Sequence, residues 1–321
     1  MSGNGPTRIE VTYATPRDFQ PAAPAAAMRR RRPVLAASLF LLTVLSTLAV
    51  GAQFEMAYAN NRPPDFLDSN PYASIWREPS LLLLGIPFSF TLMGILLAHE
   101  LGHYFACRYY GIAASYPYFL PAPTIIGTLG AFIRIRSPIV NRKALFDVGL
   151  AGPVVGFLFA VPALAVAIAY SKRIPAEQVD SVIAFGQPLL SELLAMFFRP
   201  GVPTEDIFLH PVGRAAWVGL FATALNLLPA GQLDGGHVVY ALASERHRRI
   251  SLTTILALIP LGIFFWPGWL LWAVLLSFLG FRHPTLMDRW EPLDRKRRAW
   301  ALIAVVIFLL CFMPAPFRLQ L

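Results

Sequence analysis

Charged residues and cysteines are both scarce in this sequence. Asp, Glu, Lys and Arg together make up 14% of the 321 residues, whereas 56% of the residues are hydrophobic. This composition argues against an ordinary soluble domain and indicates a polytopic membrane protein. The only two cysteines, Cys107 and Cys311, lie far apart in the sequence, so no disulfide framework is indicated.

Basic residues outnumber acidic ones, with a formal net charge of +9 and a pI near 9.9. The arginines flank apolar segments and do not alternate with aromatic residues, so a nucleic-acid partner is not expected. Membrane topology and the anionic headgroups of a lipid bilayer explain their placement better. The basic loops alternate along the chain, and the positive-inside rule then places the N-terminus in the cytoplasm.

Seven apolar segments are candidates for membrane spans. They cover residues 34–52, 80–106, 144–170, 211–228, 250–266, 269–281 and 300–317. The stretch 113–137 is also apolar, but its prolines and glycines disfavour a regular spanning helix. The predicted fold is an all-α polytopic membrane protein with about seven transmembrane helices and a re-entrant loop or short β-hairpin over 113–137.

The chain divides into four predicted parts. Residues 1–33 form a disordered cytoplasmic tail, 34–79 the first transmembrane helix and an external loop, 80–245 a three-helix core, and 246–321 the C-terminal transmembrane helices. The tail is not predicted to be a secretory signal peptide, because the apolar segment that follows it has no clear cleavage site. The first half of segment 144–170 contains Gly149, Gly152 and Gly156, which permit close helix approach.

The most informative stretch is His99-Glu100-Leu101-Gly102-His103, inside the apolar run 81–105. On a helix, His99 and His103 lie one turn apart on the same face and can both bind one tetrahedral zinc. Glu100 can then take a proton from a water molecule that the zinc activates. The alternative is a helix end whose polar groups reach the interface, but ionisable groups in a span usually serve a function.

Two histidines leave tetrahedral zinc one protein ligand short. Among the acids of the later apolar segments, Asp147 and Asp234 stand out. Asp234 lies in a second motif, Asn226-Leu227-Leu228-Pro229-Ala230-Gly231-Gln232-Leu233-Asp234-Gly235-Gly236-His237. This motif stands at the cytoplasmic end of span 211–228, level with the histidines, and no cation within it pairs with Asp234. The alternative role for Asp234 is helix capping. Asp147 is interpreted as a helix-start residue near Lys143.

The two motifs, their order and their place at span ends resemble the site-2 protease family of intramembrane zinc metalloproteases over residues 80–245. The resemblance implies that His99, His103 and Asp234 bind one zinc ion per chain and that Glu100 is the catalytic base. It also implies a protease that hydrolyses peptide bonds within or next to transmembrane segments of membrane proteins. Segment 171–210 is too short for the PDZ domain of many members, so the minimal type is expected.

Two further polar residues lie at the ends of the second motif, Asn226–His237. Asn226 is the side chain best placed to stabilise an oxyanion or hold substrate backbone, with an interhelical packing hydrogen bond as the alternative. His237 is either a donor to a zinc ligand or a histidine of the cytoplasmic surface. Because a helix hides its carbonyl groups, the substrate must unwind, and stretch 113–137 could receive it as an added strand.

Two other functions stay open at this point. One is a different membrane zinc peptidase, whose third ligand would be His or Glu. The other is a non-proteolytic zinc-binding membrane protein, either a carrier or an inactive scaffold. The expected partners are a transmembrane protein substrate and the bilayer, in a bacterial inner membrane or alternatively a plastid membrane. The sequence does not predict an oligomeric state.

Overall fold

The computed structural model describes residues 33–63, 78–175, 183–279, 286 and 292–319, all within one compact unit, Arg32–Leu321. The predicted tail lies outside the described residues except for Pro33. The helices are α1 (Pro33–Ala59), η2 (Pro79–Gly85), α3 (Ile86–Tyr109), α4 (Arg142–Tyr170), α5 (Leu189–Phe198), η4 (Thr204–Asp206), α6 (Pro211–Asn226), α7 (Asp234–Ala243), α8 (His247–Phe264), α9 (Gly268–Leu279) and α10 (Arg295–Cys311).

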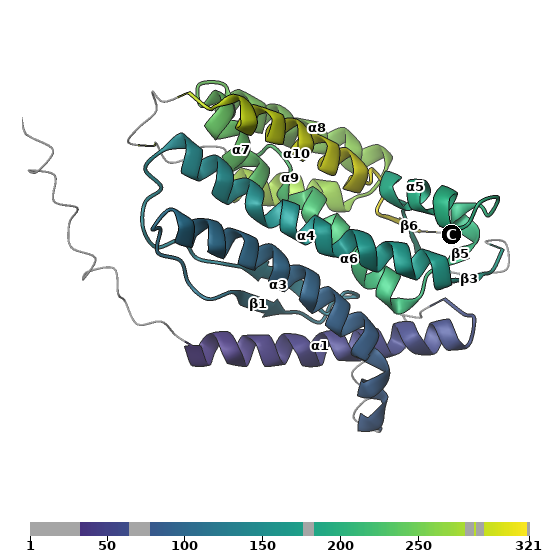
Figure 1. Cartoon of the computed structure of the whole chain (residues 1–321). Helices are drawn as coiled ribbons and strands as arrows, with labels where there is room; N and C mark the ends of the chain where they lie inside the picture. Colours follow the sequence, from purple (N-terminus) through teal and green to yellow (C-terminus); the bar gives the residue numbers. More distant parts are fainter. Residues whose placement is uncertain (1–32, 64–77, 176–182, 280–285, 287–291, 320–321) are drawn as a thin grey trace, which may run out of the picture. The chain divides into compact units, whose positions relative to one another are not determined.

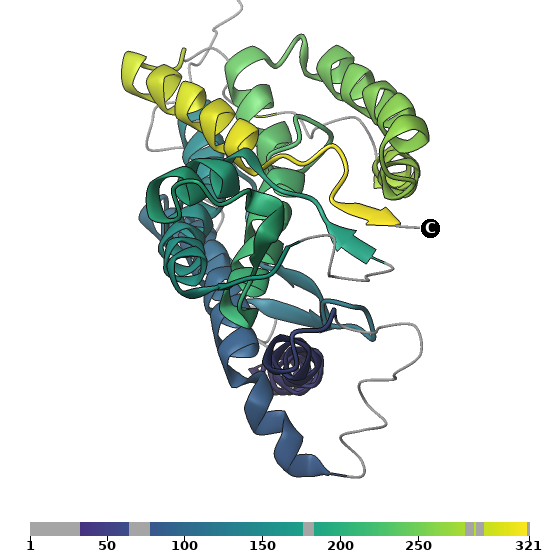
Figure 2. The ribbon, with the colours of Figure 1, turned by 90° about the vertical axis from the view of Figure 1, so that its right-hand side faces the viewer.

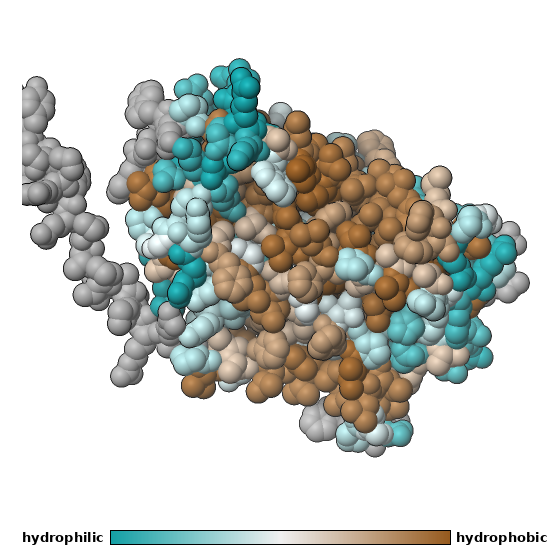
Figure 3. Space-filling model, viewed as in Figure 1, coloured by the Kyte–Doolittle hydropathy of each residue, from teal (hydrophilic) through white to brown (hydrophobic). Residues whose placement is uncertain are grey.

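The protein is mainly helical, as expected, and three helical stretches are long and apolar enough to cross a membrane. Among the described residues these are α1, the continuous stretch Pro79–Tyr109 and α4. The later helices are shorter or less apolar, so the total of about seven spans stays a prediction. Figure 3 shows apolar side chains spread widely over the face that carries α3, α4 and α10.

The first helix is longer than the predicted span 34–52. Residues 53–59, expected to open an external loop, continue α1 for almost two more turns. Phe54 is buried here and its ring packs 5.0 Å from that of Phe88 on α3. This tertiary contact favours helix where the local polarity alone suggested a loop.

Helices α3, α6 and α7 pack against α4, which carries the small residues Gly149, Gly152 and Gly156. Helix α3 lies against α4, and α4 also contacts α6 and α7 (Figures 1 and 2). The approach of α3 to α4 is close, because a Cβ atom on Gly102 would lie 2.6 Å from the Ala151 carbonyl oxygen. Side chains on these helices therefore face one another at short range.

The proline- and glycine-rich stretch 113–137 contains a β-hairpin. Strands β1 (Tyr118–Pro121) and β2 (Thr128–Phe132) pair antiparallel, with an irregularity between Phe119 and Pro121. Gly127 has φ +82°, which favours glycine in the turn, and its carbonyl accepts a 2.6 Å hydrogen bond from Ser46 of α1. Helix α1 thus holds the hairpin beside α3 (Figure 1). Its depth in a membrane stays a prediction.

Two smaller sheets join distant parts of the chain. Strand β3 (Lys172–Arg173) pairs with β5 (Ile207–Phe208), and β4 (Ile183–Phe185) pairs with β6 (Phe317–Leu319). The second pair connects the segment after α4 to the end of the chain (Figure 2). The C-terminal helices are therefore tied to the core at one end by backbone pairing.

Candidate metal centre

The two histidines of the first motif lie where helical periodicity predicts. Helix α3 places His99 and His103 one turn apart, with both side chains buried. Their ring centroids are 4.9 Å apart and their Nε2 atoms 3.1 Å apart. Both imidazoles therefore direct their Nε2 atoms toward a common position, where a metal ion could bind.

Asp234 reaches this point from a different helix. It is the first residue of α7, and the tight turn before it contains Gly231 at φ +55°. The N-cap of α7 is Leu233, without a side-chain capping bond, so the Asp234 carboxylate is not positioned as a cap. Its Oδ2 atom lies 3.3 Å from Nε2 of His99 and 3.3 Å from Nε2 of His103.

The spacing of these three atoms fits zinc. Tetrahedral coordination with bonds of about 2.0–2.1 Å separates ligand atoms by about 3.3 Å. The three separations here are 3.1, 3.3 and 3.3 Å. Within the described residues, His99, His103 and Asp234 form one group able to hold a metal ion. Two imidazoles and a carboxylate would leave the fourth position for water or substrate.

The tautomer of His103 is fixed by the backbone of α4. Its Nδ1 atom lies 2.7 Å from the Val148 carbonyl oxygen, which can only accept a hydrogen bond. Nδ1 must therefore carry the proton and Nε2 must present its lone pair to the site. Such a bond also orients the ring of a metal ligand and increases its basicity.

Two glycines of α4 make room for the imidazoles. A Cβ atom on Gly152 would lie 2.1 Å from Nε2 of His103, and one on Gly156 would lie 3.1 Å from Nδ1 of His99. The predicted role of these glycines was close helix packing. The structure shows a more specific role, because Gly152 leaves space for the nitrogen that faces Asp234.

A cavity of about 220 Å³ opens beside the three side chains. Glu100 is buried and lines it, as does Ile133, just after β2. Asn226, the last residue of α6, has Nδ2 3.3 Å from Nε2 of His99. His237 also lines the cavity, which places it beside the site rather than on a remote surface.

The structure thus brings together all five residues that the sequence singled out for the site: His99, Glu100, His103, Asn226 and Asp234. Their individual roles stay predictions. Asp147, interpreted as a helix-start residue and not a ligand, lies near the start of α4 and pairs with Arg297 of α10. The Val148 carbonyl was missed, because a backbone group carries no signal in the sequence.

A comparison with known protein families matches the part of the chain that contains the candidate metal centre. A model of peptidase family M50 matches residues 87–266, more than half of the chain. No solved structure matches. The matched range contains every residue proposed for the metal centre.

Several curated relatives are plant proteins named as probable zinc metalloproteases. The chain is 33% identical over 217 residues to "Probable zinc metalloprotease EGY1, chloroplastic" of Arabidopsis thaliana, covering 64% of this chain and 39% of that protein. It is 29% identical over 297 residues to the EGY1 protein of Oryza sativa subsp. japonica, covering 88% and 50%. The chain spans half or less of the length of these relatives. On the family match and the metal centre together, the chain belongs to peptidase family M50, the site-2 family of intramembrane zinc metalloproteases.

Proposed function

We propose that this chain is an intramembrane zinc metalloprotease that hydrolyses peptide bonds within or next to transmembrane segments of membrane proteins. The observation that carries the proposal is the convergence of His99, His103 and Asp234 within 3.3 Å of one another, beside the buried Glu100. Family membership and the names of the relatives support the same activity.

Zinc bound to these three residues would polarise the scissile carbonyl and make water a better nucleophile. Glu100 then accepts the proton of the attacking water and passes it to the leaving amine. Its burial beside the imidazoles keeps bulk water away from that transfer. Asn226, whose Nδ2 lies 3.3 Å from Nε2 of His99, donates from its side-chain amide to the oxyanion or to the substrate backbone.

The substrate must offer extended backbone at this cavity, since a helix hides its carbonyl groups. Residues Ala131, Phe132 and Ile133, at the end of β2, line the cavity together with Glu100. A substrate strand added along the hairpin would therefore lead directly into the site. We propose this mode of binding for an unwound segment of a single-span protein.

The ends of several helices support the predicted topology. Arg142 at the start of α4 donates a 3.1 Å hydrogen bond to Ser244 after α7, and Arg297 of α10 contacts Tyr110 after α3. These basic ends lie on one side of the helices. Lys172, beyond the other end of α4, contacts Tyr58 near the end of α1. We place the basic ends and the N-terminus in the cytoplasm. A bacterial inner membrane or a plastid membrane is the proposed location.

Replacing Glu100 by Gln tests the proposed function most directly. Glu100→Gln should retain zinc and lose cleavage of a model transmembrane substrate, because the amide cannot accept the proton. Glu245→Gln, an exposed acid after α7, is the matched control and should behave as wild type. Full cleavage by Glu100→Gln would contradict the assigned base.

The same preparations separate the alternatives. A membrane zinc peptidase of another type would keep its zinc after Asp234→Ala, whereas the proposed centre would lose it. A zinc carrier would need further metal-binding groups along a path through the helices. The described ranges hold no second group of three or more His, Cys, Asp or Glu able to bind a metal.

A further inference from the structure

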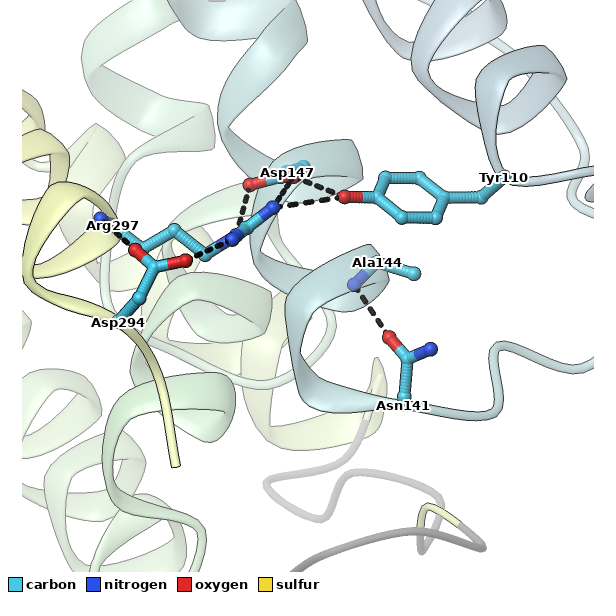
Figure 4. Close-up of polar contacts among 6 residues, drawn as sticks. All are labelled: Tyr110, Asn141, Ala144, Asp147, Asp294 and Arg297. Atoms are coloured by element: carbon cyan, nitrogen blue, oxygen red, sulfur yellow. Dashed lines mark hydrogen bonds and ion pairs between the residues drawn. The ribbon is translucent and has the colours of Figure 1, made fainter. Parts of the chain in front are cut away.

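A cluster of three side chains joins the C-terminal helix to the helices of the metal centre. Arg297 in the first turn of α10 donates from Nε to Oδ1 of Asp147 at 2.9 Å, and from Nη2 to Oδ2 of the same carboxylate. Nη2 also donates to Oη of Tyr110 at 3.0 Å. Tyr110 in turn donates its hydroxyl proton to Asp147. Figure 4 shows the three side chains meeting from three elements.

The ion pair between Arg297 and Asp147 is bidentate, which is the strong geometry for a guanidinium and a carboxylate. Two parallel N–H···O bonds from a guanidinium to a carboxylate fix orientation as well as charge. The side chains are only 21% and 30% exposed for Arg297 and Asp147, so water screens the pair incompletely. Asp294, the N-cap of α10, also accepts hydrogen bonds from the Arg297 backbone and guanidinium, which holds the arginine in place.

Tyr110 stays a hydrogen-bond donor at any physiological pH. Burial, and then its hydrogen bond to Asp147, raise the pKa of Tyr110 to about 12. Its hydroxyl proton therefore stays available for the bond to Asp147.

The cluster lies one peptide bond from a group that orients a proposed zinc ligand. Asp147 directly precedes Val148, whose carbonyl oxygen accepts the Nδ1–H bond of His103 at 2.7 Å. Tyr110 follows the end of α3, seven residues after His103, and α3 and α4 are the two helices that this bond connects. Holding Tyr110 to Asp147 therefore fixes the register between His103 and its acceptor.

We propose that Arg297 is a positioning residue for the metal centre, acting through Asp147 and the Val148 carbonyl on the orientation of His103. Arg297 lies outside the residues 87–266 that match the family, so this support comes from the C-terminal part of the chain. The proposal rests on His103 being a zinc ligand, as the proposed function has it.

The test uses the full chain in lipid nanodiscs, with Co²⁺ in place of Zn²⁺ as a spectroscopic probe. Arg297→Gln should alter the Co²⁺ absorption bands, weaken Zn²⁺ binding about 10-fold, and lower kcat with little change in KM. Loss of groups that support metal ligands costs about 10–100-fold in affinity or activity, and the indirect path argues for the lower end. Arg298→Gln, which removes an exposed neighbouring charge, should match wild type in all three measurements.

A folded Arg297→Gln protein with the wild-type Co²⁺ spectrum and Zn²⁺ affinity would overturn the proposal, even if its thermal stability fell. If Arg297→Gln does not fold, Arg297→Lys and Tyr110→Phe decide the matter, because lysine lacks the two-pronged contact and phenylalanine lacks only the hydroxyl. Wild-type spectra in both would equally overturn it. If wild type and Arg298→Gln bind no Co²⁺, the proposed metal centre itself fails, which is a distinct result.

Discussion

Oδ2 of Asp234 lies 3.3 Å from Nε2 of His103, although 131 residues separate them in the chain. The two residues lie on different helices, His103 on α3 and Asp234 at the start of α7. An aspartate used for helix capping would point at backbone N–H groups instead. The same carboxylate oxygen is equally close to His99. The roles of all three residues can therefore be tested through a single variant.

Asp234→Ala should abolish stoichiometric zinc binding and, with it, cleavage of a transmembrane substrate. Two imidazoles alone hold zinc weakly, because tetrahedral protein sites use three or four protein ligands. Zinc content of the purified protein measures the effect. Asp206→Asn is the matched control, because the side chain of Asp206 has the same 16% exposure and pairs with Arg173 away from the site. Zinc retained by Asp234→Ala would show that another residue is the third ligand.

Gly152→Ala should remove zinc binding without touching any ligand. The added methyl carbon would lie 2.1 Å from Nε2 of His103, so the imidazole must rotate away or α3 must separate from α4. The matched control is Gly94→Ala on α3, where a Cβ atom meets no other atom within 4 Å. Zinc titration of the two variants checks the prediction. Equal zinc affinity would show that the His103 ring is not held as described.

The positions of the residues in the first motif were predictable from the sequence because they depend on local periodicity. Helical spacing alone puts His99 and His103 on one face, and Glu100 next to them. The position of Asp234 followed from its motif and from the expected level of the span ends. Asn226 was placed beside the site, and it lies 3.3 Å from His99.

Contacts between distant segments were not predictable in the same way. The bond between Ser46 and Gly127 holds the hairpin against α1, and nothing in either segment indicates the other as its partner. Arg297 binds Asp147 from 150 residues away, and nothing near Asp147 in the sequence indicates this partner. Such pairs depend on helix packing, which local composition does not determine.

Asn226→Ala should lower kcat about 10²–10³-fold while leaving zinc bound, the usual cost of removing one oxyanion donor. The Nδ2 atom of Asn226 lies 3.3 Å from Nε2 of His99. Zinc bound to His99 would occupy the lone pair of Nε2. The Asn226 amide would then be free to donate to the substrate. Thr223→Val is the control one turn earlier on α6, where the hydroxyl bonds only within the helix, to the Gly219 carbonyl. If Asn226→Ala lowers stability instead, with kcat unchanged, its role is interhelical packing.

Cleavage should be fastest in substrates whose membrane helix unwinds easily. The cavity of about 220 Å³ is lined by the end of β2, which suits an extended segment better than a helix about 10 Å wide. Replacing a Gly-Pro pair near the scissile bond of a single-span substrate by Leu-Leu should therefore lower kcat/KM in vesicles. Short peptides carrying the same two sequences control for side-chain preference, because neither forms a stable helix in water. A loss of the same size in peptides and in the full span would show that local sequence, and not unwinding, sets the rate.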